Sequence, residues 1–303
     1  MIEDNSGMFH LVLGTAQLGM SYGIANKSGK PDFATALAIV QTAWESGITE
    51  FDTAQAYGDS EQILGRIFKE LGIVQKVKVI TKLHPQKFRA GEIELRQSVE
   101  QSLDRLNVSC LHGLLLHRED MLDLISDDYK EVLRGMIRNG YIRHLGVSVY
   151  SPERAKQAIE NDLMEIVQIP TSILDQRFHR AGVFAMASDL GRQIYIRSIF
   201  LQGLVLMGRE DMSEKMASVK PILEKMDALS GRFHLTKRAM ALIYVRDLFP
   251  QAKVIFGAET PEQIQQNVHS WKEDNPRGFL TAINDTFPES LDEEILNPAK
   301  WFH

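Results

Sequence analysis

The sequence predicts an α/β protein, a parallel (β/α)8 TIM barrel that forms a single domain over residues 1–303. Eight short runs rich in β-branched residues or leucine recur along the chain, and each precedes a longer segment with helical spacing. The composition does not change abruptly, and no linker rich in Pro or Ser separates one part of the chain from another. Strands and helices that alternate in this number without a break are typical of a closed barrel of parallel strands.

The predicted elements alternate in strict order. The strands are residues 10–16, 48–54, 77–83, 111–117, 142–148, 165–170, 193–198 and 253–258. The helices are residues 32–47, 60–72, 94–107, 129–140, 151–162, 181–191 and 260–271. Several begin at Asp, Ser or Thr with Glu soon after, which indicates N-caps or capping boxes at 59–61, 151–153 and 260–262. Several end at a glycine, namely Gly47, Gly72, Gly140 and Gly191.

The longest stretch between two predicted strands is 199–252, which holds two helical segments, 213–231 and 236–249. We therefore expect an extra helical segment or a long loop between the seventh and eighth strands. A doubly wound open sheet is the competing architecture. It usually has fewer strands, and its nucleotide-binding form favours a G-x-G-x-x-G motif after the first strand, which this chain lacks.

The charge and cysteine content narrow the class of protein. A formal charge of -6 shows no basic excess, which argues against nucleic acid or an anionic membrane as the main partner. The single cysteine, Cys110, excludes an intrachain disulfide framework and suits a reducing compartment. Two early acids without a basic region argue against a signal peptide, and no apolar stretch approaches the ~18 residues of a membrane span. We expect a cytoplasmic protein, monomeric or weakly dimeric, since no heptads or long apolar surface runs occur.

Polar residues stand where each predicted strand ends, which is the face of such a barrel that carries active sites. They are Asp52, Lys82, His117, Ser148, Gln168, Arg197 and Ser198, with Tyr57 on the loop after the second strand. Lys82 and His117 interrupt apolar runs, and a charge in such a place costs free energy unless it is paired. Taken singly, these residues also fit a structural ion pair, an interior histidine or a turn aromatic. Their presence at consecutive strand ends favours a catalytic site.

The residue types at this face indicate proton donation. Asp52 and Lys82 follow adjacent strands, so a salt bridge between them is expected. A lysine beside Tyr57 would favour the phenolate and lower the pKa of that tyrosine, which would make it a general acid near neutral pH. His117 could hydrogen-bond the same substrate oxygen. No metal site is predicted, because His84, His112 and His117 lack a close paired spacing and no Asp, Glu or Cys cluster accompanies them.

The chain resembles the aldo-keto reductase family over nearly its whole length. The resemblance rests on GTAQLG (14–19), FDTAQAYGDSEQILG (51–65), ITKL (80–83), LLLH (114–117), IRHLGVS (142–148), VQIP (167–170), RSIFLQG (197–203) and GAETPEQIQQN (257–267). The spacing of Asp52, Tyr57, Lys82 and His117 matches the family's catalytic tetrad. The resemblance implies an NAD(P)H-dependent oxidoreductase that reduces an aldehyde, ketone or sugar-like carbonyl, or runs the reverse reaction, with the cofactor extended across the barrel mouth.

The resemblance also implies the residues around the nicotinamide and the pyrophosphate. Thr15, Ala16 and Asp52 would lie beside the nicotinamide ribose, and Ser148 and Gln168 would hold the carboxamide. The family often has Asn after this serine, whereas this chain has Val149, so one amide contact is missing. Arg197 takes the position against the nicotinamide ring, where a guanidinium stack or a contact to a substrate anion is expected. The segment from Ser198 to Leu204, which includes Leu201 and Gly203, would wrap the pyrophosphate with its backbone amides.

At the adenosine end, the resemblance implies contacts from Gly257, Ala258, Glu259, Gln263 and Asn267, the last to adenine. Members selective for NADPH carry cations in and after the eighth strand, but this stretch has none, and Gln263 stands where arginine is common. Glu259 adds a negative charge that disfavours a 2′-phosphate and could accept a hydrogen bond from a ribose hydroxyl. We therefore expect NADP(H) or NAD(H) rather than strict use of NADPH.

Two other functions stay open on the sequence. One is a cofactor-bound regulatory or binding subunit with little turnover, which the intact tetrad disfavours. The other is a different barrel enzyme, such as an isomerase that uses Lys82 as a Schiff base. The expected partner is a small-molecule carbonyl compound, with pocket walls from loops 20–30, 84–89 and 118–127 and from residues 300–303.

Overall fold

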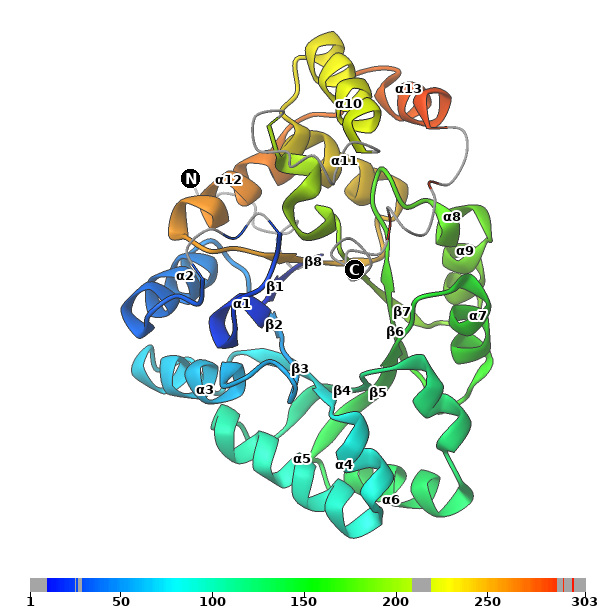
Figure 1. Cartoon of the computed structure of the whole chain (residues 1–303). Coiled ribbons are helices and arrows are strands. Elements are labelled where there is room, and N and C mark those ends of the chain that lie inside the picture. Colours follow the sequence, from blue (N-terminus) through cyan, green and yellow to red (C-terminus); the bar gives the residue numbers. More distant parts are fainter. Residues whose placement is uncertain are drawn as a thin grey trace.

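The computed structural model is a closed barrel in which each strand runs parallel to its two neighbours (Figure 1). It describes residues 10–24, 26, 29–208, 219–287, 291 and 296. The strands are β1 (Leu11–Gly14), β2 (Glu50–Asp52), β3 (Lys78–Leu83), β4 (Leu111–Leu116), β5 (Ile142–Ser148), β6 (Ile166–Pro170), β7 (Gln193–Arg197) and β8 (Lys253–Gly257). The barrel closes between β1 and β8, with Leu11 opposite Val254 and Gly14 opposite Gly257. The predicted (β/α)8 barrel is confirmed, and each strand lies within its predicted run.

Helices form a ring around the barrel (Figure 1). The α-helices are α1 (Ala16–Gly19), α2 (Phe33–Glu45), α3 (Ser60–Glu70), α4 (Pro85–Ala90), α5 (Glu92–Leu106), α6 (Asp127–Arg138), α7 (Pro152–Glu160), α8 (Arg177–Arg180), α9 (Val183–Asp189), α10 (Lys220–Phe233), α11 (Lys237–Leu248), α12 (Pro261–Lys272) and α13 (Phe279–Thr286). The 3-10 helices η2 (Glu119–Leu124) and η3 (Leu201–Leu206) lie on loops at the carboxyl ends of β4 and β7.

The expected extra helix between the seventh and eighth strands is present. It is α10, which lies outside the ring next to α13, while α11 is the crossover helix that leads into β8 (Figure 1). Residues 213–218 of the predicted segment lie outside the described residues. That residues 1–303 form one domain stays a prediction. None of the helices in the described ranges is long and apolar enough to cross a membrane.

Two of the three predicted N-terminal caps are confirmed, and the third is wrong. Ser151 and Thr260 cap α7 and α12, because their side chains accept hydrogen bonds from the backbone N–H groups of Arg154 and Gln263. The four predicted terminal glycines all have positive φ angles. The capping box at 59–61 is wrong, because the carboxylate of Asp59 binds Lys30 instead of capping the helix.

The barrel interior contains a layer of apolar side chains, and polar side chains lie next to it at the carboxyl ends of the strands. Val12, Ile80, Leu115, Ile166, Tyr195 and Ile255 form an apolar cluster separate from the main core. Because side chains alternate along a strand, residues two positions apart face the same way. Lys82 and Gln168 therefore lie above Ile80 and Ile166 on the same inner face. The apolar cluster forms the floor of a polar site at the carboxyl ends of the strands.

Candidate active site

A cavity of about 540 Å³ opens at the carboxyl ends of the barrel strands. At one end it is lined by Asp52, Tyr57, Lys82 and His117, so the structure brings the four predicted catalytic residues together. The predicted cofactor residues in its wall are Thr15, Ala16, Asp52, Ser148, Gln168, Arg197, Ser198, Gly203, Gly257, Glu259 and Gln263. The predicted contacts Leu201, Ala258 and Asn267 are buried behind the wall and do not line the cavity.

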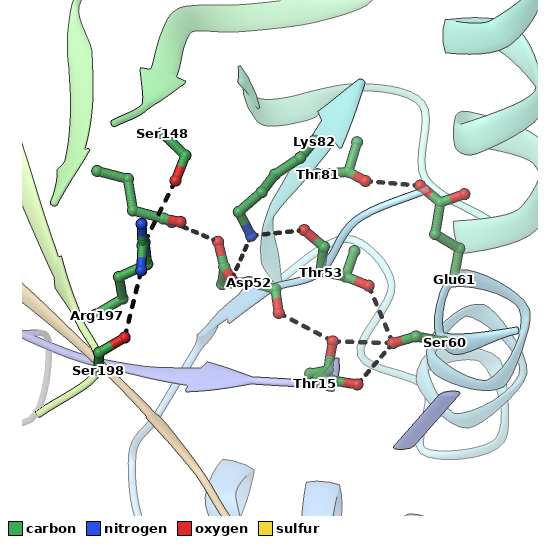
Figure 2. A network of polar contacts seen from close by, with 11 residues as sticks. Thr15, Asp52, Thr53, Ser60, Glu61, Thr81, Lys82, Ser148, Arg197 and Ser198 are labelled. Carbon is green, nitrogen blue, oxygen red and sulfur yellow. Dashed lines mark hydrogen bonds and ion pairs between the residues drawn. The ribbon is translucent and has the colours of Figure 1, made fainter. Parts of the chain in front are cut away.

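The predicted ion pair between Asp52 and Lys82 is present and buried (Figure 2). The Lys82 Nζ lies 2.6 Å from Oδ2 of Asp52, and the two side chains are 1% and 6% exposed. Lys82 also donates to the Thr53 carbonyl at 3.0 Å. The other carboxylate oxygen of Asp52 accepts a hydrogen bond of 2.8 Å from the Gln168 amide. A buried pair whose remaining lone pairs and protons are satisfied in this way has a fixed geometry.

The pKa of Tyr57 departs from the expectation. Burial raises the pKa of the Tyr57 phenol, the Asp52 carboxylate raises it further, and Arg197 opposes them. The Nζ of Lys82 lies 5.0 Å from the centroid of the Tyr57 ring. However, burial lowers the pKa of the Lys82 ammonium, and its charge is paired with the carboxylate of Asp52. The prediction that Lys82 lowers the pKa of Tyr57 is therefore wrong for this structure. The phenol stays protonated at neutral pH, as a proton donor must be.

His117 is a neutral neighbour of Tyr57. Its ring meets the tyrosine ring edge-on, with centroids 5.6 Å apart. Burial, with smaller contributions from the charges of Lys82 and Arg197, lowers the pKa of His117 to about 3. A neutral imidazole carries one N–H, so His117 can donate a hydrogen bond without carrying a charge.

A second layer of hydroxyl groups holds the strand ends that carry this cluster (Figure 2). The Thr15 hydroxyl donates to the Asp52 carbonyl at 2.9 Å, and the Ser60 hydroxyl donates to the Thr15 carbonyl at 2.9 Å. Thr53 donates to the Ser60 hydroxyl at 3.0 Å. These bonds join β1, β2 and the start of α3, so the backbone on both sides of Tyr57 is fixed.

Two glycines allow the first loop to lie directly against the loop that carries Tyr57. A Cβ on Gly19 would lie 1.9 Å from the Tyr57 carbonyl oxygen, and a Cβ on Gly58 would lie 2.3 Å from the Gly19 carbonyl oxygen. Gly58 also has a φ of +55°, a left-handed conformation that disfavours other residues. The position of Tyr57 therefore depends on the turn that follows β1.

The donors and acceptors in and beside the cavity fit a nicotinamide dinucleotide. The Oε1 of Gln168 is buried and has no hydrogen-bond partner within the described chain, although the Nε2 of the same side chain binds Asp52. A free acceptor next to the Tyr57 end suits the N–H groups of a carboxamide. The Nδ2 of the buried Asn267 is likewise unpartnered among the described residues. Buried polar groups normally have partners, so the free Oε1 of Gln168, which lines the cavity, indicates a ligand that donates to it. Asn267 does not line the cavity, so its Nδ2 carries no such indication.

The loop after β7 has an unusual backbone. Ser198, Leu201, Gln202 and Gly203 all have positive φ angles, between 46° and 97°. The N–H groups of Leu201 and Gly203 donate within the loop, to the carbonyls of Ser198 and Phe200. These two amides are thus already occupied, which differs from the expectation that they bind a pyrophosphate directly. Non-glycine residues in this conformation cluster at ligand-binding sites.

The cavity wall includes residues that sequence reasoning missed. They include Gln17, Tyr150 and Arg238. Tyr22 lies in the expected loop 20–30, but none of residues 84–89 or 118–127 lines the cavity, so those two expected walls are wrong. Arg89 and Arg118 instead bind Asp120 at the surface. Residues 300–303 lie outside the described residues.

No group of three or more His, Cys, Asp or Glu within the described ranges could hold a metal ion.

The fold and the site define a (β/α)8 barrel with a buried Asp–Lys pair, a tyrosine and a histidine at one end of a cavity. Comparisons with known proteins show the family to which this chain belongs. The family model "Aldo/keto reductase family" matches residues 10–284. The chain is 30% identical to the aldo-keto reductase YhdN of Bacillus subtilis over 89% of this chain and 90% of that protein. It is 24% identical to the NADH-specific methylglyoxal reductase of Escherichia coli, over 80% of this chain and 84% of that protein.

A solved structure shares the fold. The holo form of the aldo-keto reductase AKR11C1 from Bacillus halodurans aligns with a TM-score of 0.77 and 21% identity, over 95% of each chain. The chain belongs to the aldo/keto reductase family. It is an NAD(P)H-dependent oxidoreductase that acts on carbonyl groups, as its family membership shows.

Proposed function

We propose that this protein reduces small polar carbonyl compounds to alcohols, with Tyr57 as the proton donor. The observation that carries the proposal is the buried Asp52–Lys82 pair at the end of the cavity where Tyr57 and His117 also stand. When bound, the reduced nicotinamide would supply the hydride that the carbonyl carbon accepts. Tyr57 then gives its proton to the carbonyl oxygen, so a C–H bond and an O–H bond form as the C=O double bond becomes single.

The other three members of the cluster orient this proton transfer. Lys82 keeps a positive charge near the phenol, and Asp52 fixes the ammonium through the 2.6 Å contact. The neutral His117 donates a hydrogen bond to the substrate oxygen and thereby orients the carbonyl toward Tyr57. Hydrogen-bond donors fixed in advance around an oxygen that gains negative charge are the usual source of such rate enhancement.

The cofactor residues follow the cavity from the catalytic end to the adenosine end. Ser148 and Gln168 would hold the carboxamide, supported by the unpartnered Oε1 of Gln168. Thr15, Ala16 and Asp52 would lie by the nicotinamide ribose, and Ser198 and Gly203 by the pyrophosphate. Gly257, Glu259 and Gln263 would lie by the adenosine. The buried Leu201, Ala258 and Asn267 would support this wall from behind.

The substrate class follows from Arg197, which lines the catalytic end. Its guanidinium contacts Ser148 Oγ, Ser198 Oγ and the Val149 carbonyl, all neutral, and lies 4.3 Å from the centroid of the Tyr150 ring. No acidic side chain of the described residues pairs with it. We therefore propose that preferred substrates carry a carboxylate or phosphate near the carbonyl group, which would pair with Arg197.

Carbonyl-dependent oxidation of NADH or NADPH by the purified protein tests this function. A panel should pair each small anionic carbonyl compound with a neutral analogue of similar size. We expect turnover with both types and a lower KM for the anionic member. Tyr57→Phe should bind the reduced cofactor with nearly unchanged fluorescence quenching while it loses turnover. Full activity of Tyr57→Phe on a confirmed substrate would refute the proposed role of the tyrosine.

A further inference from the structure

A half-buried arginine stands at the adenosine end of the cavity, where the sequence suggested no cation. Arg238 lies in the first turn of α11 and lines the same cavity as Glu259 and Gln263. Its guanidinium donates to the Asn267 Oδ1 at 2.6 Å and lies 5.7 Å from the centroid of the Phe200 ring. Asn267 itself is fully buried. Arg238 is thus the side chain that reaches from Asn267 to the cavity.

The charge of Arg238 is uncompensated in the described part of the chain. Its guanidinium donates to a neutral amide, that of Asn267, and no carboxylate in the described part of the chain lies within salt-bridge distance of it. Glu259 lines the same cavity but does not pair with it. A charge held out of water without a counterion is unfavourable, and bound ligands commonly supply the missing opposite charge. The planar guanidinium is well suited to a phosphate, which it can bind with two parallel hydrogen bonds.

The position of Arg238 distinguishes it from the other cavity arginine. Arg197 lies at the catalytic end of the cavity, where its guanidinium donates to Ser148 Oγ and to the Val149 carbonyl. Arg238 instead contacts Asn267, which lies in α12, and Phe200, which directly precedes η3. The two cations therefore lie at different places along the cavity, Arg197 at the catalytic end and Arg238 beside Glu259 and Gln263. The anion that distinguishes NADPH from NADH is at the adenosine end.

We infer that Arg238 binds the 2′-phosphate of NADPH, while Glu259 on the neighbouring loop favours the 2′-hydroxyl of NADH. This inference rests on the proposed function, since it assumes that the cavity binds the dinucleotide with its nicotinamide at Tyr57. It corrects the sequence-based expectation that this end lacks a cation. The two opposed charges would let one site accept both cofactors, and each charge would shift the preference in its own direction.

Fluorescence titration with NADPH and with NADH tests the inference without any need for a substrate. Arg238→Met should weaken NADPH binding by roughly 10- to 100-fold and change NADH binding by less than about threefold, because only NADPH carries the phosphate. Glu259→Gln should tighten NADPH relative to NADH. Arg96→Met is the matched control, since Arg96 is exposed on α5, away from the cavity lining. It should leave both affinities unchanged.

Calorimetry with adenosine fragments gives an independent readout. The wild-type protein should bind 2′,5′-ADP more tightly than 5′-ADP, and Arg238→Met should lose that preference. Equal weakening of NADPH and NADH in Arg238→Met would place the guanidinium at the pyrophosphate or adenine and overturn the inference. Unchanged NADPH affinity would overturn it as well. Failure of the wild-type protein to bind either cofactor would instead refute the proposed function, and the inference with it.

Discussion

The ammonium of Lys82 lies 2.6 Å from a carboxylate oxygen of Asp52, and both side chains are almost completely buried in the wall of the cavity. Removal of one partner leaves the other charge buried and unpaired. We expect Lys82→Met to lower the free energy of unfolding by about 3–5 kcal/mol, and the double variant Asp52→Asn/Lys82→Met to recover much of that loss. Urea denaturation measures both effects.

The exposed Lys30–Asp59 pair offers a matched control for this first prediction. Its side chains are 37% and 49% exposed, although its contact is as short. Lys30→Met should therefore change the free energy of unfolding by no more than about 1 kcal/mol. Equal stability of Lys82→Met and the wild-type protein would contradict the buried pair.

The second prediction concerns proton donation by Tyr57. Tyr57→Phe keeps the ring and removes the donor, so kcat should fall by roughly 10²–10⁴. The double variant Tyr57→Phe/Lys82→Met should be little slower than the slower single variant, because residues that act as a unit are not additive. Steady-state kinetics on one confirmed substrate decides this. Losses that multiply in the double variant would show that Lys82 acts independently of Tyr57.

The third prediction follows from the raised pKa of Tyr57. Burial, reinforced by Asp52, keeps the phenol protonated well above neutral pH. The rate of carbonyl reduction should therefore stay level between about pH 7 and 9, since the donor form is retained up to and beyond the ordinary tyrosine pKa of about 10. A kcat profile at saturating cofactor measures this. A fall centred near neutral pH would show that another group, or a shifted Tyr57, controls the reaction.

The fourth prediction concerns acid stability. Burial lowers the pKa of His117 to about 3 and that of His112 to about 4. Between these values and the unfolded pKa of about 6.5, the unfolded chain binds more protons than the folded protein, so stability falls as the pH falls through this window. His117→Gln should remove up to about 1.4 kcal/mol per pH unit of that slope. Denaturation at several pH values, with the exposed His269→Gln as the control, measures it.

The fifth prediction separates the substrate role of Arg197 from a general role. Arg197→Met should raise KM for an anionic carbonyl substrate by about tenfold or more, which corresponds to the loss of one charge-assisted contact. KM for the neutral analogue should change much less. Equal effects on both substrates would point to a contact with the cofactor rather than with a substrate anion.

Much of the fold could be read from local patterns. Each strand is a short apolar run, and Ser151 and Thr260 cap their helices through contacts a few residues away. The cap predicted at Asp59 failed because its carboxylate is bound by Lys30, which lies 29 residues earlier. Long-range competition for a side chain is invisible in a local pattern.

The site likewise contains residues that the sequence predicts and residues that depend on long-range packing. Asp52, Lys82 and His117 end adjacent strands, so barrel topology alone predicts that they meet. Arg238 comes from the start of α11 and reaches the cavity only because α11 and α12 pack together. In the sequence, Arg238 is one of two cations just before a run of apolar helix residues, and nothing in that pattern indicates a contact with the cavity. The pKa of Tyr57 could not be predicted either, because the balance between desolvation and nearby charges depends on burial that the sequence does not state.

The contact between Gly19 and the Tyr57 loop has a consequence for protein engineering. The loop after β1, which contains Gly19, and the loop after β2, which contains Tyr57 and Gly58, cannot move independently. The backbone of each loop occupies the space that a side chain at the glycine of the other loop would need. Loop grafts that exchange either segment alone, for instance to alter substrate range, should displace the tyrosine, whereas grafts that exchange both together should preserve it. The same coupling allows substitutions near Met20 to change turnover without touching a substrate.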